Sequence, residues 1–370
     1  MKKMYALVTG TRPQIIKSVP IIRSADSSSE IEIIHIFTGQ HYDSYLADVF
    51  FQALEIALPK HQLNVRSGST DYHIRMILEK LVPLLKKDKI TGILVPGDTN
   101  SALAAGLAGM FLSIPVIHIE AGLRSNDLHM QEEINRRLID HGSSVLFAPT
   151  KTAVENLKNE SVLGKVILSG DTMLDLLLTE KDKITDKSLF NKAANSYDLV
   201  KKKYSIMTVH RRENVSNLEK LKQIFGAIGQ TDIKTIFPIH PNTRRIVEQS
   251  NLKISSNIQL INPISYQVFL NLVAFSGLVV TDSGGIQKEA YLLNVPCITL
   301  RSSTEWVETK VNGANRIVGA NPVLISQAIS ESFNKKLNTD SSVYGNGKAA
   351  EIIVQELIKD HPKIPTVLEP

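Results

Sequence analysis

The chain has 370 residues, of which 43% are hydrophobic and 21% are charged, and its formal net charge is +5. This length predicts two domains, and these proportions exclude a disordered or fibrous chain. The small positive surplus does not predict a nucleic-acid groove, but it suits an anionic small molecule. The single cysteine, Cys297, excludes an intrachain disulfide framework and a multi-cysteine zinc site. No apolar run is long enough for a signal peptide or a membrane span, so we expect a cytoplasmic protein without membrane contact.

Short β-branched runs alternate with longer amphipathic segments along the whole chain. The first series of predicted strands covers residues 4–9, 31–38, 92–95, 116–120 and 145–149. The second series covers residues 204–210, 233–240, 258–261, 277–281 and 295–300. Helical patterns between the strands include 100–111, 132–144, 218–228 and 266–276. Apolar strands that alternate with helices predict parallel sheets that are covered on both faces.

A charged, weakly apolar stretch at 177–204 separates the two series of strands. We interpret it as containing the connection between two domains, with some helix of its own. The predicted fold is therefore α/β, with two doubly wound Rossmann-like domains facing a cleft. We place an N-terminal domain at 1–175 and a C-terminal domain at 200–347. The tail at 348–370 begins with a predicted amphipathic helix, and packing back onto the N-terminal domain is one arrangement open to it.

Polar residues stand at the carboxyl ends of these strands, which is where ligands bind in sheets of this kind. Six strand ends carry them, with the following residues: Arg12 and Lys17, Asp98, Glu120, His210 and Arg211, His240, and the run TDSGG at 281–285. Helix capping explains one polar strand end. Six ends that combine His, Arg, Asp and Glu favour an active site.

Several of these residues have a structural alternative. Asp98 can cap the helix that starts near Asn100. His210 and His240 can be core histidines, although the arginines beside them favour an anion site. A histidine-based metal site is not predicted because no matching spacing accompanies them, and no G-x-G-x-x-G run indicates a dinucleotide.

The carboxylates of the first half raise a second alternative. Glu120 would be costly to bury unpaired, so it needs a basic partner or a substrate. Arg136 and Arg137 follow Glu132 and Glu133 at helical spacing, so pairs on a solvated helix face would explain all four residues.

The run TDSGGIQKEA at 281–290 joins a predicted strand to a helix. Gly284 and Gly285 would let a ligand approach the backbone N–H groups at the positive end of the helix, and Ser283 could add a hydroxyl donor. Glu289 returns to the same helix face one turn later. A carboxylate beside a phosphate fits if it accepts hydrogen bonds from neutral hydroxyls, as in a ribose diol next to a diphosphate. An ordinary strand–turn–helix joint with a solvated glutamate is the alternative.

Taken together, the motifs resemble the non-hydrolysing UDP-N-acetylglucosamine 2-epimerases from Gly10 to about Gly319. The runs that carry the resemblance are GTRPQIIK, TGQHYD, GDTNS, HIEAGLRS, EEINRR, TVHRREN, HPNTR and TDSGGIQKEA. The resemblance implies a glycosyltransferase-B type fold, UDP held mainly by the C-terminal domain, and inversion at C2 of the sugar. It also implies no metal, no redox cofactor and a homodimer.

The resemblance further implies roles for individual residues, each assigned from the motif that it matches. The implied nucleotide-binding residues are Ser283, Gly284 and Gly285 for the diphosphate, Glu289 for the ribose diol, Phe269 for the uracil, and Arg12, Lys17 and His210 for the phosphates and the leaving oxygen. The implied proton-transfer carboxylates are Asp98, Glu120 and Glu132, with Arg136 as their ion-pair partner. The implied region for a second, activating UDP-sugar contains Gln40, His41, Arg211 and His240.

Three positions depart from the family pattern. Gln14 stands where many members have glutamate, and the loop before Glu132 is short, which weakens the role given to that residue. Trp306 stands where many members have a second arginine and resembles relatives that act on UDP-2,3-diacetamido-glucuronate. Because that cation is lost, Arg301 in the same loop is the expected substitute. Besides this second substrate, a retaining glycosyltransferase, a UDP-sugar sensor and a hydrolysing epimerase remain open.

Overall fold

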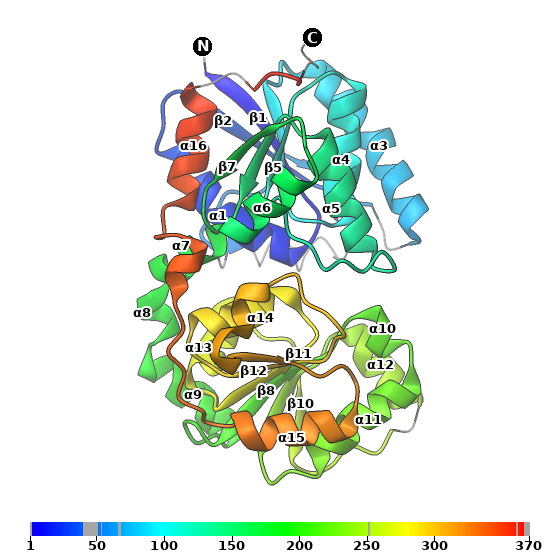
Figure 1. Ribbon diagram of the computed structural model, residues 1–370, viewed down its shortest axis with the longest axis vertical. Coiled ribbons are helices and arrows are strands. Elements are labelled where there is room, and N and C mark those ends of the chain that lie inside the picture. The colour runs from blue at the N-terminus through cyan, green and yellow to red at the C-terminus, as the bar shows by residue number, and fades with distance from the viewer. Residues whose placement is uncertain are drawn as a thin grey trace. The chain divides into compact units, whose positions relative to one another are not determined.

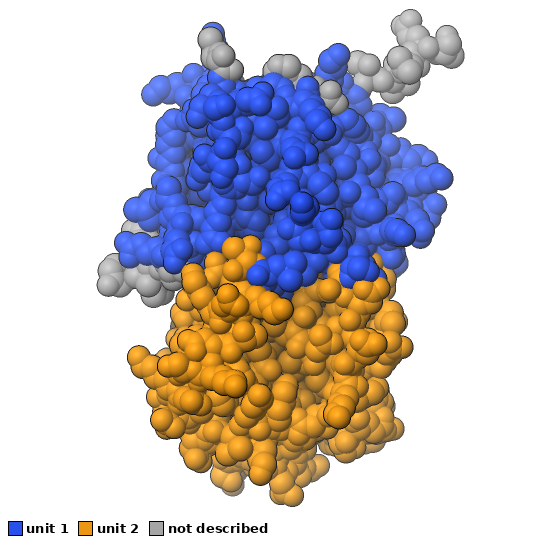
Figure 2. Space-filling model, turned by 90° about the vertical axis from the view of Figure 1, so that its left-hand side faces the viewer, with its two compact units in different colours: residues 1–178, 342–370 blue, residues 179–341 orange. Residues whose placement is uncertain are grey.

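The computed structural model describes residues 2–39, 51–52, 54–65, 68–250, 252–359 and 362–365. The chain divides into two compact units, which Figure 2 colours separately. Unit 1 comprises Met1–Leu178 and Ser342–Pro370, and unit 2 comprises Thr179–Ser341. The chain therefore leaves unit 1 within the charged stretch and returns to it for its last segment.

Unit 1 is built on a seven-stranded parallel sheet with the order β3-β2-β1-β4-β5-β6-β7. Its strands are β1 (Lys3–Thr9), β2 (Ile31–Phe37), β3 (His61–Gln62), β4 (Gly92–Pro96), β5 (Val116–Ile119), β6 (Val145–Ala148) and β7 (Lys165–Leu168). Its helices are α1 (Arg12–Asp26), α3 (Thr70–Lys87), α4 (Asn100–Phe111), α5 (Gln131–Gly142), α6 (Lys151–Asn159), α7 (Thr172–Thr179) and α16 (Ala349–Lys359).

The strands of unit 1 alternate their side chains between two apolar layers. Ala6 and Val8 of β1 pack in a cluster with α3 and α4. Tyr5 and Leu7 of the same strand pack in the opposite cluster with α1 and α16. The C-terminal helix lies beside α1 in unit 1 (Figure 1), and the Tyr5 hydroxyl donates to the carbonyl of Leu357 at 2.9 Å. The last segment of the chain thus completes the core that the first strand begins.

Unit 2 is built on a six-stranded parallel sheet with the order β10-β9-β8-β11-β12-β13. Its strands are β8 (Tyr204–Thr208), β9 (Lys234–Pro238), β10 (Ile258–Ile261), β11 (Leu278–Thr281), β12 (Cys297–Thr299) and β13 (Asn315–Ile317). Its α-helices are α8 (Lys181–Ile184), α9 (Lys187–Tyr197), α10 (Arg212–Val215), α11 (Leu218–Gly229), α12 (Pro241–Gln249), α13 (Tyr266–Phe275), α14 (Gly284–Leu292) and α15 (Pro322–Ser332). Short 3-10 turns lie at Val307–Gly313 and Ser341–Tyr344.

The predicted α/β fold with two doubly wound sheets is confirmed. The strands that the sequence pattern missed are β3, β7 and β13. All three lie at sheet edges, and each is short or largely exposed. Their sequences therefore lack the long apolar run by which a central strand is predicted. Because the strands of each sheet are parallel, their carboxyl ends share one edge, and the loops there carry most of the polar residues discussed below.

Candidate active site

Unit 1 brings two predicted carboxylates to neighbouring strand ends. Asp98 follows β4 and Glu120 follows β5, and these two strands are paired. Arg136 of α5 reaches the first carboxylate, with 2.6 Å between its Nη2 and Asp98 Oδ2, and only 2% of its side chain is exposed. Thr99, and not Asp98, provides the side-chain cap of α4. The capping alternative for Asp98 and the solvated-pair alternative for Arg136 are therefore both wrong.

Lys17 of α1 forms the second ion pair of this edge. Its Nζ lies 2.5 Å from Glu120 Oε1, and both side chains are almost fully buried. Burial by itself would lower the pKa of Lys17, but the carboxylates of Glu120, Asp98 and Asp171 outweigh that effect, and the pKa is raised. The ammonium group is therefore charged at neutral pH and stands close to three carboxylates.

The turns that present these groups have left-handed backbone, which is strained at Glu120 and freely adopted at Gly97. Glu120 has φ of +70°, in the left-handed region that non-glycine residues seldom adopt. Gly97 has φ of +71°. A Cβ at Gly97 would lie 3.5 Å from Lys17 Nζ and 4.0 Å from Glu120 Oε1. Strain of this kind persists where the surroundings enforce it, and it is concentrated at functional sites.

Glu132 and Glu133 lie in different surroundings at the start of α5. Glu133 is fully buried and accepts hydrogen bonds from the Ser125 N–H at 2.8 Å and from Arg137 Nε at 3.0 Å. It also accepts from Arg136 Nη1 at 3.1 Å. Glu132 is only half-buried. Glu133, which helical spacing had placed near the two arginines, thus holds Arg136 in place. The role of Glu132 in proton transfer stays a prediction.

The loop after β1 is tied to the end of β4 by Gln14. The Gly10 N–H donates to Gln14 Oε1 at 2.9 Å, and Gln14 Nε2 donates to the Pro96 carbonyl at 2.8 Å. An ionised glutamate could accept the first hydrogen bond but could not donate the second. The amide of Gln14 therefore makes both hydrogen bonds, one as an acceptor and one as a donor. Arg12 is the first residue of α1 and is partly exposed.

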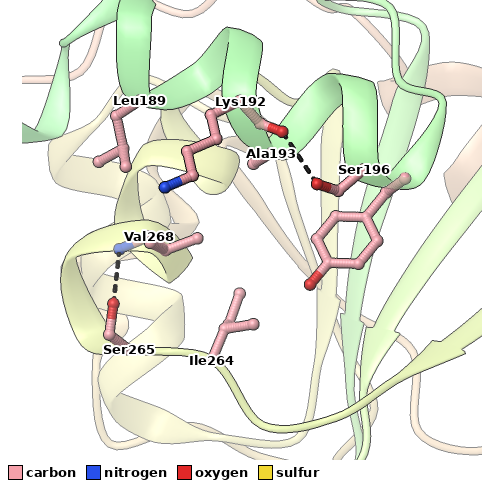
Figure 3. A pocket seen from close by; sticks show the side chains of 8 residues that line it. Leu189, Lys192, Ala193, Ser196, Ile264, Ser265 and Val268 are labelled. Carbon is pink, nitrogen blue, oxygen red and sulfur yellow. Dashed lines mark hydrogen bonds between the residues drawn. The ribbon is translucent and has the colours of Figure 1, made fainter.

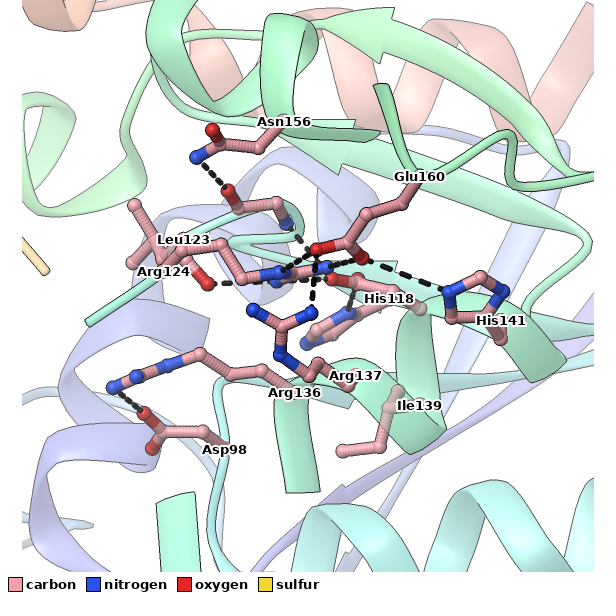
Figure 4. Close-up of polar contacts among 12 residues, drawn as sticks. Asp98, His118, Leu123, Arg124, Arg136, Arg137, Ile139, His141, Asn156 and Glu160 are labelled. Atoms are coloured by element: carbon pink, nitrogen blue, oxygen red, sulfur yellow. Dashed lines mark hydrogen bonds and ion pairs between the residues drawn. The ribbon is translucent and has the colours of Figure 1, made fainter. Parts of the chain in front are cut away.

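A buried ion-pair network adjoins the Asp98 loop (Figure 4). His118 Nδ1 lies 2.6 Å from Asp140 Oδ1, and both side chains are fully buried. Arg124 Nη1 lies 2.7 Å from Asp140 Oδ2, and Arg124 Nη2 lies 2.7 Å from Glu160 Oε2. Burial by itself would raise the pKa of Asp140, but His118 and Arg124 outweigh it, and the pKa is lowered. The sequence did not single out these four residues, because nothing in their spacing shows that they meet.

In unit 2, the turn between β11 and α14 contains Ser283 and Gly284. The Ser283 N–H donates to Thr281 Oγ1 at 3.0 Å. A Cβ at Gly284 would lie 2.2 Å from Glu305 Oε1. A side chain here would displace the Glu305 carboxylate, so the helix start that was expected to be open lies beside an anion of the chain itself. Gly285, the next residue, is partly exposed.

Glu289 lies on α14 one turn after this start, as predicted. It is 4% exposed, and the Tyr266 hydroxyl donates to its Oε1 at 2.9 Å. A carboxylate accepts hydrogen bonds and has about four lone-pair sites, which is the chemistry that ligand hydroxyls require. Phe269 lies on α13, the helix that also carries Tyr266, and it is buried.

Two buried cations are found in this part of unit 2, one in the loop after β12 and one on α14. Arg301 Nη1 lies 2.8 Å from Glu305 Oε2. Trp306 is buried, and its Nε1 lies 3.4 Å from the position of a Cβ on Gly284. Lys288 of α14 is also buried, with its Nζ 3.9 Å from the centre of the Trp306 ring. That Arg301 replaces the missing arginine stays a prediction, and the structure adds the Lys288 ammonium, which stacks on the indole, as a second cation in this region.

Asp282 shapes the loop after β8. Its buried carboxylate accepts from the His210 N–H at 3.1 Å, from the Arg211 N–H at 2.9 Å and from Asn214 Nδ2 at 3.1 Å. His210 Nδ1 lies 3.5 Å from Asp282 Oδ1, and 47% of the His210 side chain is exposed. The pKa of exposed His240 is lowered, first by partial burial and then by nearby His210. The alternative of two core histidines is therefore wrong.

The remaining predicted residues, Gln40 and His41, lie outside the described residues. Within the described ranges, no three His, Cys, Asp or Glu side chains are grouped as a metal ion would require. Among the helices that the structure describes, none combines the length and apolar character needed to cross a membrane.

Unit 2 also contains a cavity of about 270 Å³ (Figure 3). It is lined by side chains of α9 and of the start of α13: Leu189, Lys192, Ala193, Ser196, Tyr197, Ile264, Ser265 and Val268. Ser265 caps α13 by accepting from the Val268 N–H at 3.4 Å. None of the predicted site residues lines this cavity.

Comparison with known proteins finds one family over most of the chain. Residues 23–358 match the family UDP-N-acetylglucosamine 2-epimerase. A UDP-N-acetylglucosamine 2-epimerase homolog of Methanococcus maripaludis is 44% identical over 95% of this chain and 98% of that protein. The UDP-2,3-diacetamido-2,3-dideoxy-D-glucuronate 2-epimerase of Pseudomonas aeruginosa is 37% identical over 95% and 98%. The crystal structure of Methanocaldococcus jannaschii UDP-GlcNAc 2-epimerase in complex with UDP-GlcNAc and UDP is similar with a TM-score of 0.90, 40% identity, and coverage of 96% of this chain and 100% of that one.

Proposed function

Because the chain belongs to the UDP-N-acetylglucosamine 2-epimerase family, we propose that it interconverts UDP-N-acetylglucosamine and UDP-N-acetylmannosamine without hydrolysis. It is an isomerase by family, and the proposal concerns its substrate and the residues that act on it. The observation that carries the proposal is the pairing of two acids on adjacent strand ends with two buried cations, Asp98 with Arg136 and Glu120 with Lys17.

The chemistry requires a route around a weakly acidic proton. The C2 proton of a 2-acetamido sugar is not acidic enough for simple removal at neutral pH. If UDP leaves C1 while a carboxylate takes the C2 proton, the product is an enzyme-bound 2-acetamidoglucal. Protonation on the opposite face, with return of UDP to C1, inverts C2. Asp98 and Glu120 are suited to these proton transfers because their cations fix the position of each carboxylate.

Unit 2 supports the nucleotide part of the proposal. The leaving diphosphate needs donors that stabilise its charge, and the start of α14 with Ser283 and Gly285 offers them. His210 is partly exposed and oriented by Asp282, so it can interact with the leaving oxygen. Glu289 is a buried carboxylate, and carboxylates accept hydrogen bonds from hydroxyls such as those of a ribose diol. These assignments agree with the roles implied by the family motifs.

The uronate substrate is a second candidate, and Trp306 favours it. The buried indole stands where many family members have an arginine, and the Pseudomonas aeruginosa relative named for the diacetamido glucuronate is 37% identical. A glycosyltransferase or a sensor without chemistry receives no such support from the comparisons.

Incubation with each UDP-sugar in deuterium oxide, followed by proton NMR, tests the proposal. We expect UDP-N-acetylmannosamine to form from UDP-N-acetylglucosamine, with deuterium incorporated at C2. Turnover of the uronate alone would transfer the assignment to that sugar. Release of free N-acetylmannosamine would indicate a hydrolysing enzyme, and transfer to an acceptor would indicate a glycosyltransferase.

We also propose that the protein acts in the cytoplasm as a homodimer that needs no metal or redox cofactor. Family membership supports this part of the proposal. Light scattering on the purified protein tests the oligomeric state, and turnover in the presence of EDTA tests the independence from metal.

A further inference from the structure

His118 is a fully buried histidine whose two ring nitrogens both face acceptors. Nδ1 lies 2.6 Å from Asp140 Oδ1, and Nε2 lies 2.9 Å from the carbonyl oxygen of Gly97. A neutral imidazole has one N–H and one lone pair, so it would aim that lone pair at an oxygen lone pair. Only the doubly protonated ring donates to both partners.

The charges around the ring agree with an imidazolium. Asp140 also accepts from Arg124, but Arg124 is shared, because its Nε and Nη2 donate to Glu160 at 2.8 Å and 2.7 Å. The Gly122 N–H donates to Asp140 Oδ2 at 3.1 Å. Asp140 therefore remains an effective counterion for a second buried cation, and His118 is the ring placed against it.

His118 also joins the two turns that present the acids. Its ring holds the Gly97 carbonyl, and the Gly97 N–H donates to the Ile119 carbonyl at 2.9 Å. Asp98 follows Gly97 directly, and Glu120 lies two residues after His118 on the same chain segment. The left-handed turn at Gly97 is thus held at both ends by β5, the strand that leads into Glu120.

We propose that His118 is a positively charged positioning residue that fixes the Gly97–Asp98 turn against Glu120. It does not touch substrate. It holds one acid at a set position relative to the other, so that the two carboxylates can serve opposite faces of one carbon atom. This inference rests on the proposed epimerase function for its kinetic consequence, but the charge on the ring is independent of that function.

His35 offers a matched control in the same sheet. It is a buried histidine of β2 whose Nε2 lies 2.8 Å from Thr9 Oγ1, a hydroxyl that can donate or accept. Burial lowers the pKa of His35 to about 4, so this ring is neutral at neutral pH. Substituting it removes a buried imidazole without removing a buried charge.

The first test compares His118→Gln with His35→Gln. We expect His118→Gln to lower kcat by roughly 10- to 100-fold, since small displacements of a catalytic group have effects of this size. The KM for UDP-N-acetylglucosamine should change by less than about threefold, and His35→Gln should change kcat by less than about threefold. Adding Asp140→Asn to His118→Gln removes the unbalanced anion and should recover part of the lost kcat. A kcat for His118→Gln equal to that of His35→Gln, or no recovery in the double variant, would overturn the proposal.

The second test uses the native protein and needs no turnover. In a spectrum of protein labelled with ¹⁵N-histidine near pH 7.5, we expect both His118 ring nitrogens to carry protons and His35 to show one bare nitrogen. A bare nitrogen on His118 would overturn the proposal even if the variants lose activity. If the native protein shows no epimerisation while the His118 ring is doubly protonated, the proposed function fails and the charged ring stands.

Discussion

The two candidate regions differ in how their charges are arranged. At the sheet edge of unit 1, each acid proposed for proton transfer has its own cation, Arg136 at 2.6 Å from Asp98 and Lys17 at 2.5 Å from Glu120. At the start of α14 in unit 2, the close anion is a carboxylate of the chain itself, Glu305, beside Gly284. The first region is organised around the groups that are proposed to react. The second carries an internal anion at the place where the phosphates are proposed to bind.

This difference separates two ways of preparing a site. The acids of unit 1 need fixed geometry, and buried ion pairs supply it because each pair is costly to break. A phosphate site needs hydrogen-bond donors that are available to the ligand. Before the ligand binds, a carboxylate of the chain can accept from such donors and keep them satisfied. Substitutions in unit 1 are therefore expected to affect turnover, and substitutions in unit 2 are expected to affect nucleotide affinity.

The largest effect is expected for the acids of unit 1. Asp98→Asn and Glu120→Gln preserve side-chain size but remove proton transfer, so turnover should fall by about 10²- to 10⁴-fold while UDP affinity changes little. Deuterium incorporation at C2 measures the first quantity, and calorimetric titration with UDP measures the second. Native exchange rates in both variants would make the acids structural and remove the contrast between the regions.

The next effect is expected at Arg301, and it tests the internal anion. Arg301→Ala leaves Glu305 buried without its cation, so the free energy of unfolding should fall by about 3 kcal/mol or more. Transition-state stabilisation should fall by about 2 kcal/mol. Arg316→Ala breaks an exposed pair with Glu331 and should alter stability by less than about 1 kcal/mol. Urea unfolding compares the two variants, and equal stabilities would show that the Arg301–Glu305 pair contributes little.

Acid pH should lower the stability of unit 1 through His35, a residue outside the proposed site. Burial lowers the pKa of His35 from 6.5 to about 4, so the unfolded chain takes up this proton first as the pH falls. The stability due to neutral His35 is fully present above pH 6.5 and is lost between pH 6.5 and about 4, by up to about 3 kcal/mol. Urea midpoints at about pH 7 and about pH 4.5 should therefore differ less in His35→Gln than in the native protein. An identical pH dependence in the variant would assign the acid sensitivity to other groups.

Nucleotide affinity in unit 2 should depend on Glu289. Glu289→Ala removes a charged acceptor from the ribose hydroxyls, so UDP binding should weaken by about 2–3 kcal/mol. Tyr266→Phe removes only the hydroxyl that donates to Glu289 and should weaken binding by about 1 kcal/mol or less. Calorimetry with UDP tests both variants. Unchanged affinity in Glu289→Ala would eliminate the diol assignment.

The smallest effect is expected from the cation that stacks on Trp306. Lys288→Met keeps the apolar stem but removes the ammonium, so UDP binding should weaken by about 1–2 kcal/mol.

Trp306→Arg should shift preference from the uronate toward UDP-N-acetylglucosamine, because a charged fork replaces an apolar face. Kinetics with both sugars on native and variant proteins decide this. If Trp306→Arg leaves the ratio of kcat/KM values unchanged, this position does not select the sugar.

Much of the fold and the family could be predicted from the sequence. Apolar strands alternating with amphipathic helices predict two parallel sheets, because fully buried strands must be continuously apolar. The residues around 281–285 predict an anion site, because consecutive glycines at a helix start expose backbone N–H groups. The edge strands β3, β7 and β13 were not predicted, because an edge strand buries too little surface to need a continuous apolar run.

Only the tertiary structure decided which charges meet. Local spacing placed Arg136 beside Glu132 and Glu133, and only the family resemblance implied Asp98 as its partner, because ion pairs form between side chains that are distant along the chain. It gave no sign that His118 lies between Asp140 and Gly97, or that Lys288 stacks on Trp306. Periodicity reports which face of an element is buried, since burial follows from the local pattern of apolar residues. The partner of a buried charge depends on how the elements pack, and this information is absent from the local pattern.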